Sequence, residues 1–283
     1  MKRVKKILRS IQKKIIIHVR EVTRPYEIHL NKNNRFKDQT AIVTGGSGVI
    51  GRAIAYRLAA EGATVYVCGT RTEKLYPIIE EITNAGFVAK PLLFDIKDEI
   101  AISKAFKQVY FESGTIDTLV CCAGGGARDK QKPFIHQTAE VIDSVLNINL
   151  RGSILCTQEA CKIMVKKKRG NIIMISSTVG VCGMPAYSEY AAAKAGIIAF
   201  VKSIAMEMGK YGIRINCITP GIIERGTIDD IKMEQIHKTN WLNSYGKPED
   251  VSGMVAFLNS EEADFITGQN YIIDGGRSLG LKQ

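Results

Sequence analysis

A tyrosine and a lysine four residues apart, Tyr190 and Lys194, are the side chains of this sequence best suited to proton transfer. On a helix, residues i and i+4 project from the same face as neighbours. An ammonium group beside a phenol favours the phenolate, which makes a tyrosine more useful as an acid or base near neutral pH. Because any helix can hold such a pair by chance, the pair predicts a function only together with other residues.

A glycine-rich loop at residues 44–51 lies between a short β-branched run and a segment with helical periodicity. Its Gly46, Gly48 and Gly51 have the spacing G-x-G-x-x-G. Glycine there lets the backbone turn sharply and approach a pyrophosphate, which rests on free N–H groups at the start of the helix. The strand before the loop and the helix after it give this common motif its specificity. We therefore expect a dinucleotide site instead of a plain tight turn.

The residues after the second expected strand, at 64–68, indicate which dinucleotide binds. NAD-binding folds usually carry an acid there, which binds the ribose 2′-OH. Here the sequence reads Gly69-Thr70-Arg71, with no acid before Glu73. An arginine suits a 2′-phosphate through a charge-assisted hydrogen bond. We expect NADP(H), with NAD(H) as the less favoured alternative. The alternative role for Arg71 is that of a loop arginine that faces solvent and binds no ligand.

Short β-branched runs alternate with longer segments of helical spacing from Thr40 onward. The expected strands are at 41–43, 64–68, 87–93, 118–121, 171–175, 214–218 and 270–273, with clear helical patterns at 50–60 and 191–208. The strands are apolar almost throughout, which is typical of burial on both faces. Repeated β-then-α order implies right-handed crossovers. We expect one α/β domain at 38–283 with a doubly wound, seven-stranded parallel sheet, preceded by an extension at 1–37.

These motifs and their order resemble the short-chain dehydrogenase/reductase family over about residues 38–280, with a Rossmann-type fold. Ser177 precedes Tyr190 by thirteen positions, and Asn149 precedes it by 41. Two further matches are Arg-Ile-Asn-Cys-Ile-Thr-Pro-Gly at 214–221 and Ile-Thr-Gly-Gln followed by Asp-Gly-Gly between 266 and 276.

The resemblance implies a role for each residue. Tyr190 would exchange a proton with the substrate oxygen, and Ser177 would hydrogen-bond the same oxygen. Lys194 would assist the tyrosine and hold the nicotinamide ribose, and Asn149 would position a water for a proton relay. Cofactor contacts are expected from Gly45, Ser47, Gly48, Ile50, Gly51, Thr70, Arg71, Asp95, Ile96, Ala123, Gly124, Tyr190, Lys194, Pro220, Gly221 and Ile223.

Two positions depart from the family's pattern. The middle glycine of the common loop T-G-x-x-x-G-x-G is Val49 here, and the spacing G-x-x-G-x-x-G instead resembles longer, nucleotide-sugar-modifying relatives. The usual Asn-Asn-Ala-Gly after the fourth strand reads Cys121-Cys122-Ala123-Gly124. By the resemblance, this change would remove side-chain hydrogen bonds that stabilise the central sheet and so lower rigidity or cofactor affinity, without removing a reacting group.

The seven cysteines are an odd number, lie mostly in apolar segments and form no C-x-x-C pair. We therefore expect no disulfide framework and no metal site, and a cytoplasmic setting. The adjacent pair Cys121-Cys122 is open to interpretation as a redox device. Small buried hydrophobic residues at a strand end are the favoured interpretation.

The net charge of +11 is concentrated in the extension, because residues 1–37 contain twelve lysines or arginines and two acids. The nearly neutral body argues against nucleic-acid binding. Apolar residues at 4, 7, 8, 11 and 15 follow helical spacing opposite lysines and arginines. Such a helix at residues 1–20 can lie on an anionic membrane surface. A transit peptide, an unstructured tail and an arm on a neighbouring subunit remain alternatives.

In overall pattern the chain is most similar to 3-oxoacyl-[acyl-carrier-protein] reductases and to related sugar or polyol dehydrogenases. The resemblance implies interconversion of a carbonyl and a secondary alcohol, with a 3-oxoacyl thioester as the leading substrate. A basic run at 166–169 would attract an acidic carrier protein, or is a solvated helix end. Relatives are generally homotetramers built through the long helices near 138–168 and 187–211. A non-catalytic dinucleotide sensor is the alternative from another class.

Overall fold

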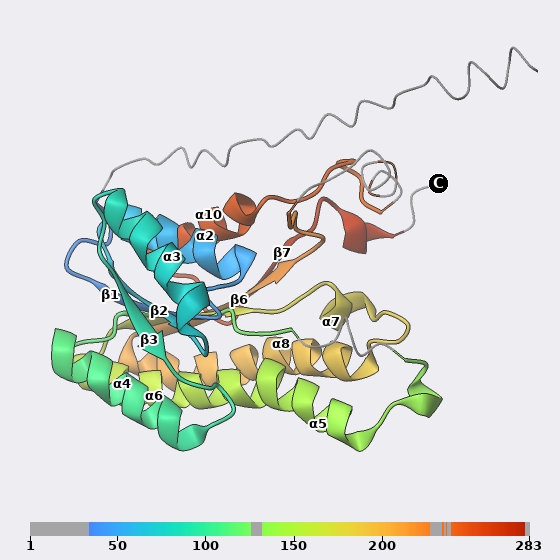
Figure 1. The fold of residues 1–283 in the computed structure, drawn as a ribbon, viewed down its shortest axis with the longest axis horizontal. Coiled ribbons are helices and arrows are strands. Elements are labelled where there is room, and N and C mark those ends of the chain that lie inside the picture. The colour runs from blue at the N-terminus through green and yellow to red at the C-terminus, as the bar shows by residue number, and fades with distance from the viewer. Residues whose placement is uncertain (1–33, 126–131, 227–233, 235, 237–238, 281–283) are drawn as a thin grey trace, which may run out of the picture.

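The computed structural model describes residues 34–125, 132–226, 234, 236 and 239–280. Seven strands form one parallel sheet in the order β3-β2-β1-β4-β5-β6-β7 (Figure 1). The strands are β1 Thr40–Thr44, β2 Thr64–Gly69, β3 Ala89–Leu93, β4 Thr118–Cys121, β5 Gly170–Ile175, β6 Ile213–Pro220 and β7 Asn270–Ile273. The predicted doubly wound, seven-stranded parallel sheet is confirmed.

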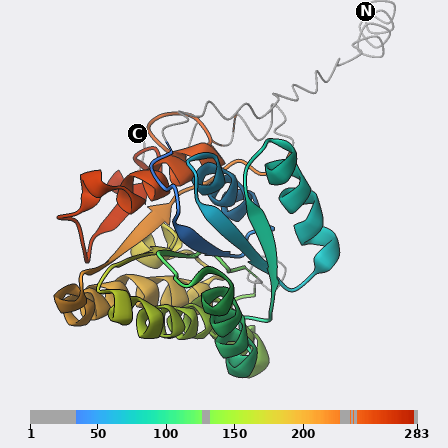
Figure 2. The same cartoon turned by 90° about the vertical axis from the view of Figure 1, so that its left-hand side faces the viewer.

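Helices cover both faces of the sheet, as the two views show (Figures 1 and 2). One layer contains α2 Val49–Ala60, α3 Thr72–Asn84 and α10 Pro248–Asn259. The other contains α4 Glu99–Ser113, α5 Ala139–Leu146, α6 Gly152–Lys167 and α8 Ser188–Met208. Shorter elements are α7 Val179–Cys182, the 3₁₀ turns η2 Phe134–His136, η4 Gly209–Tyr211, η5 Glu261–Ala263 and η6 Arg277–Leu279, and the π-helical turn η3 Asn147–Arg151.

Successive residues of the central strands enter different cores, one on each side of the sheet. In β2, Val65 and Val67 pack with α2, α3 and α10, whereas Tyr66 and Cys68 pack with the opposite layer. Side chains of a strand alternate between the two faces, so both sets must be apolar when helices cover both sides. This burial explains why the strands are apolar almost throughout.

One strand begins later than expected. Phe87 and Val88 precede β3, because the Phe87 amide still donates to the Ile82 carbonyl at the end of α3. Among the described residues, no helix combines the length and the apolarity that crossing a bilayer requires.

The reversal of strand order defines where a ligand can bind. The chain builds β1, β2 and β3 outward, then returns to place β4 on the other side of β1. Crevices outside the carboxyl ends of the strands at such a switch point are the usual ligand sites of open α/β sheets. The paired residues Thr44 and Cys121 mark this point.

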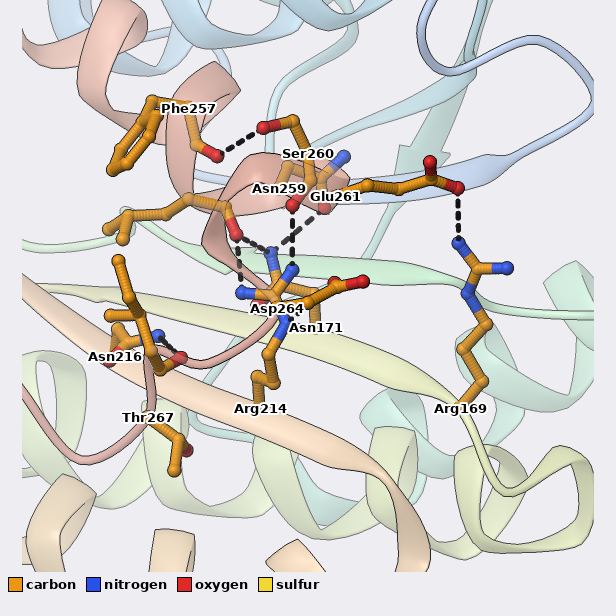
Figure 3. A network of polar contacts seen from close by, with 12 residues as sticks. Arg169, Asn171, Arg214, Asn216, Phe257, Asn259, Ser260, Glu261, Asp264 and Thr267 are labelled. Carbon is orange, nitrogen blue, oxygen red and sulfur yellow. Dashed lines mark hydrogen bonds and ion pairs between the residues drawn. The ribbon is translucent and has the colours of Figure 1, made fainter.

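The opposite, amino-terminal edge is fastened by a structural polar network (Figure 3). The Asn171 side-chain amide donates to the Leu258 carbonyl (3.0 Å) and to the Asn259 side-chain oxygen (2.9 Å). Arg214 donates to the carbonyls of Leu258 (2.7 Å) and Ser260 (3.2 Å). Burial lowers the pKa of the Arg214 guanidinium below its usual value. These bonds satisfy carbonyl groups at the end of α10, which an α-helix cannot satisfy internally.

The folded body includes residues 34–37, which belong by their polar, basic composition to the predicted extension at 1–37. Phe36 is fully buried in the core, and its amide donates to the Glu61 carbonyl (2.8 Å). Arg35 forms an ion pair with the buried Glu61 carboxylate (2.6 Å). A polar, basic stretch concealed this one core phenylalanine. The amphipathic pattern at 4–15 and the expected membrane contact through 1–20 lie outside the described residues, and both stay predictions.

Candidate active site

Tyr190 and Lys194 lie in the first two turns of α8. Tyr190 is half-buried and Lys194 is buried. The Lys194 Nζ lies 5.7 Å from the centroid of the Tyr190 ring. The same ammonium donates to the carbonyl of Ile175, the last residue of β5 (2.9 Å). The helix therefore supplies the pairing, and the strand end fixes the direction of the lysine.

The loop after β5 brings Ser177 to the same end of the sheet. The side chain of Ser176 donates to the Lys194 carbonyl (2.8 Å), which fastens α8 to this loop. The Ser177 hydroxyl accepts the amide of Val179 at the start of α7 (3.3 Å). A Cβ at Gly180 would lie 2.7 Å from the Lys194 carbonyl carbon, so only glycine allows α7 to pack this closely on α8. Ser177 is thus held beside the turn that carries Tyr190 and Lys194.

Asn149 is fully buried in the π-helical turn between α5 and α6. Its side-chain nitrogen donates to the carbonyls of Val145 (2.9 Å) and Gly125 (2.9 Å), and its side-chain oxygen accepts the Gly125 amide (2.9 Å). The side chain therefore fixes the backbone after β4. Sequence patterns did not predict the π-helical turn, although such turns are frequent at functional sites. The expected water-positioning role of Asn149 stays a prediction.

Glycines of the phosphate loop create a cradle of backbone groups. Gly45 has a φ of +65°, and a Cβ there would lie 2.6 Å from the Ala123 Cα. A Cβ at Gly51 would lie 2.2 Å from the Gly45 oxygen. Ser47 and Gly48 are exposed, and no side chain caps the N-terminus of α2, whose first turn holds no acid. Uncapped N–H groups at the positive end of a helix fit an anionic pyrophosphate.

Thr44 connects this loop to the end of β4. Its buried hydroxyl accepts the amides of Cys122 (3.1 Å) and Ala123 (3.1 Å) and donates to the Val120 carbonyl (3.4 Å). This contact stabilises the segment where the family's usual asparagines are replaced by Cys121 and Cys122. Thr44 is thus a supporting residue whose role no motif in the sequence indicates.

The adjacent cysteines have the environment of packing residues. Cys121 is buried, with its sulfur 3.7 Å from the Ser153 carbonyl and 3.8 Å from the Thr157 hydroxyl. Burial raises the pKa of Cys121 to about 12 and that of Cys122 to about 11. Both thiols are therefore neutral at physiological pH, and a neutral thiol is a poor nucleophile. This favours the interpretation as small buried residues over a redox device.

The residues expected to contact the adenine half lie at the carboxyl ends of β2 and β3. Thr70 and Arg71 are exposed immediately after β2. Within the described part of the chain, no acidic side chain forms an ion pair with Arg71. Asp95 accepts the Lys97 amide (2.9 Å), and Ile96 is buried. The guanidinium of Arg71 is thus available to an anion.

The segment after β6 completes the row of loops. Pro220 is the last residue of β6, and the Gly221 amide donates to the Ile273 carbonyl (2.8 Å). The Ile223 side chain is buried in the core, while its backbone pairs with Gly246 as an isolated parallel bridge. In this parallel pairing, Gly246 bonds to the Ile222 carbonyl and to the Glu224 amide. The N–H and C=O groups of Ile223 itself therefore point away from Gly246.

Comparison with known proteins agrees with this geometry. A family model described as enoyl-(acyl carrier protein) reductase matches residues 46–278. The chain is 36% identical over 247 residues to the 3-oxoacyl-[acyl-carrier-protein] reductase of Aquifex aeolicus, covering 86% of this chain and 98% of that protein. The chain belongs to the short-chain dehydrogenase/reductase family.

Other similar short-chain dehydrogenases/reductases differ in their names. One from Armillaria gallica, named only by the family, is 36% identical over 251 residues, covering 84% of this chain and 95% of that protein. A solved structure of a putative gluconate dehydrogenase from Agrobacterium tumefaciens superimposes with a TM-score of 0.81 and 29% identity. That match covers 88% of this chain and 99% of the other. The chain is therefore an NAD(P)-dependent oxidoreductase of this family.

One buried acid of this short-chain dehydrogenase/reductase was missed by sequence reasoning. Glu189, immediately before Tyr190, is 5% exposed. Its carboxylate accepts hydrogen bonds from Gln137 (3.0 Å) and Ser188 (3.1 Å). An acid in the first turn of a helix is an ordinary feature, so the spacing carried no signal that this one ties the first turn of α8 to the segment before α5.

Proposed function

We propose that this short-chain dehydrogenase/reductase is an NADP(H)-dependent ketoreductase whose leading substrate class is a 3-oxoacyl thioester. The observation that carries the proposal is the arrangement of α8 against β5, with Lys194 beside Tyr190 and Ser177 in the adjoining loop. The same edge of the sheet carries the uncapped glycine loop. A proton donor and a pyrophosphate cradle at one edge suit hydride transfer to a carbonyl.

Side chains of this protein transfer the proton and stabilise the charge that develops on the substrate oxygen. A bound nicotinamide supplies or accepts the hydride at the substrate carbon. In reduction, Tyr190 Oη gives its proton to the substrate oxygen while Ser177 donates a hydrogen bond to that oxygen. In oxidation, Tyr190 takes the alcohol proton. The Lys194 side chain, held by the Ile175 carbonyl, lies beside this phenol.

The preference for NADP(H) is supported by Arg71. Its exposed guanidinium follows β2, and Gly69 and Thr70 supply no carboxylate. A 2′-phosphate would gain a charge-assisted hydrogen bond there, whereas a carboxylate would repel it.

An acyl carrier protein is the partner that the thioester substrate implies. The basic run at 166–169 is a poor docking site for it, because the run precedes β5 and thus lies at the opposite edge from Ser177. Two of its side chains are also paired, Lys167 with Asp117 (2.6 Å) and Arg169 with Glu261 (3.7 Å). We expect the carrier protein to approach the carboxyl-terminal edge instead.

A homotetramer in the cytoplasm is the remaining part of the proposal. A mainly apolar groove of about 360 Å³ runs between α6 and α8, with Phe200, Ile204 and Met208 on its α8 side. These are the two long helices through which subunits are expected to pack, and a second copy of the chain would cover the groove. Five of the seven cysteines are buried as packing residues, a use of cysteine that suits a reducing compartment. Light scattering on the purified chain measures the mass directly; a monomer contradicts the tetramer.

A sugar or polyol dehydrogenase is the second candidate, favoured by the likeness to the putative gluconate dehydrogenase. Turnover of an acetoacetyl thioester is compared with that of a sugar, sugar-acid and polyol panel, using both dinucleotides. We expect the thioester with NADPH to give the highest kcat/KM. A higher kcat/KM for a panel member assigns the second candidate.

The matched test of the mechanism compares Tyr190→Phe with Tyr76→Phe, an exposed tyrosine on α3. Loss of the general acid lowers kcat about 10²- to 10⁴-fold, with a much smaller change in the NADPH Kd, because Tyr190 is one of many residues expected to contact the cofactor. Tyr76→Phe keeps the kcat of the unmodified chain. A Tyr190→Phe variant of unchanged kcat overturns the mechanism, and absence of dinucleotide binding by the unmodified chain overturns the function.

A further inference from the structure

A second cavity adjoins the loop that carries Ser177. Its volume is about 400 Å³. Three segments that are distant in sequence form its walls: α7 with the residues after it, residues 239–241, and the C-terminal residues 277–280. The first wall begins at Thr178, directly after Ser177. The cavity is therefore continuous in sequence with the expected catalytic loop, and its volume suits a small organic molecule.

The second and third walls are fixed to each other. The Trp241 amide donates to the Gly275 carbonyl (2.9 Å). A Cβ at Gly276 would lie 3.1 Å from the Trp241 ring, so the indole lies close over this glycine backbone. Asp274 accepts the amides of Gly276 (2.8 Å) and Ser278 (2.7 Å). These contacts hold the C-terminal segment in one conformation against Trp241, so it forms a fixed wall of the cavity.

Arg277 supplies a positive charge to this cavity. The side chain is partly buried, and its one hydrogen bond among the described residues goes from Nη1 to the Thr239 carbonyl (3.3 Å). A guanidinium carries five N–H donors, and removal from water is costly for a charge without a partner. No carboxylate of the described residues forms an ion pair with Arg277. The cavity thus presents unused donors for an oxyanion.

Apolar side chains surround the remainder of the cavity. Met184 and Trp241 are 45% and 48% exposed, although both line a concave surface, and Val179 completes the apolar wall. Exposed apolar groups in a concave site are typical of ligand binding. Cys182, the exposed one of the seven cysteines, lies in the same wall.

We propose that this cavity binds an oxyanion carried on a short apolar chain, with Arg277 binding the carboxylate or phosphate and Trp241 and Met184 contacting the chain. The inference rests on the proposed function in one respect, because the ligand is taken to be the part of the substrate remote from the carbonyl. It adds one feature to the substrate class, namely an anionic group on the part of the ketone or alcohol that is remote from the reacting carbon.

The first experiment measures binding without turnover. Iodoacetamide labelling of Cys182 is followed by mass spectrometry in the presence of hexanoate, hexyl phosphate or uncharged hexanamide, with Cys182→Ser as the labelling control. We expect the two anions to slow the labelling of Cys182 and hexanamide to leave the rate unchanged. The more strongly protecting anion identifies the carboxylate or the phosphate as the source. Equal effects of all three probes overturn the proposal.

The arginine is then tested directly. Arg277→Gln shifts the anion concentration for half-protection upward about tenfold, the loss expected for one charge-assisted hydrogen bond, and Arg277→Lys restores part of it. The same anion concentration in all three chains overturns the assignment. If Arg277→Gln proves unfolded by circular dichroism, Arg277→Lys alone decides, because loss of the bidentate geometry still weakens binding.

The second experiment uses turnover. The ratio of kcat/KM for a 3-oxoacyl thioester whose acyl chain ends in a carboxylate to that for the same thioester with an uncharged methyl end falls about tenfold in Arg277→Gln. An unchanged ratio overturns the proposal. If the unmodified chain reduces neither compound, the ketoreductase function fails on its own, whereas protection of Cys182 still decides whether the cavity binds an oxyanion.

Discussion

Asn149 and Lys194 approach each other over Gly124, although they come from a π-helical turn and from α8. A Cβ placed at Gly124 would lie 2.7 Å from the Asn149 side-chain oxygen and 3.2 Å from the Lys194 Nζ. The backbone of the β4 loop thus brings two polar groups to one point without any side chain between them. This point belongs to the edge where the dinucleotide is expected.

Gly124→Ala tests this convergence. The added methyl must displace the Asn149 amide or the Lys194 ammonium, and a displacement of about 1 Å at a reacting centre costs roughly 10²-fold in rate. We expect kcat/KM to fall by about that factor while the chain stays folded. The control is Gly253→Ala on α10, where the added Cβ meets nothing within 4 Å beyond the backbone of its own helix. Equal kcat/KM values for the two variants contradict the prediction.

Arg71→Ala tests the choice of dinucleotide. Loss of one charge-assisted bond to a phosphate corresponds to about 1.5–3 kcal/mol, so the Kd for NADPH rises tenfold or more. The Kd for NADH changes little, because NADH has no 2′-phosphate. Fluorescence titration measures both values, and Lys74→Ala, exposed in the first turn of α3 directly after Arg71, is the control. Tighter NADH than NADPH binding by the unmodified chain shows that the NADP(H) assignment is wrong.

Thr44→Val tests the support of the β4 loop. The substitution leaves the amides of Cys122 and Ala123 without their buried acceptor. Leaving buried polar groups unpaired costs about 1–3 kcal/mol each, so we expect the free energy of unfolding to fall by at least about 1 kcal/mol. Denaturant titration measures it. Thr83→Val, exposed on α3, serves as the control and changes it by less than about 0.5 kcal/mol.

Asn171→Ala tests the polar network at the amino-terminal edge. It removes the donor to the Leu258 carbonyl and to the Asn259 side chain. We expect a loss of about 1–3 kcal/mol in the free energy of unfolding, with no change in the NADPH Kd, because the network lies at the edge opposite the site. Asn84→Ala at the exposed end of α3 is the matched control. A weaker NADPH Kd in Asn171→Ala would contradict the structural role.

Buried thiols predict how stability depends on pH. Burial raises the pKa of Cys161 and of Cys217 to about 11, whereas an exposed thiol of the unfolded chain titrates near 8.5. The unfolded state therefore loses protons first, so stability is complete below pH of about 8.5 and declines as the pH rises toward 11. We expect the decline between pH 8 and 10 to be shallower in Cys217→Ala than in the unmodified chain. Parallel curves would rule out this thiol as a cause.

The spacing of residues along the sequence was sufficient to predict much of the fold and of the candidate site. The i, i+4 relation of Tyr190 and Lys194 is a property of any α-helix, so it could be predicted before the helix was seen. The apolar runs gave seven strands because a parallel sheet covered on both faces needs apolar side chains on both. The carboxyl ends of parallel strands share an edge, which is why loops distant in sequence could be assigned to one site.

Features that depend on packing between distant segments could not be read in this way. The π-helical turn at Asn149, the threonine at 44 that supports the β4 loop, and the burial of Phe36 and Glu189 carry no periodic signature. The cavity at Arg277 exists because three separate segments converge there. The residue pattern thus specified which groups are present and which helix or strand carries them. Three-dimensional packing decided which of those groups meet. Contacts between distant segments depend on side-chain volumes and on how closely two backbones approach, and the spacing of residues along the sequence encodes neither.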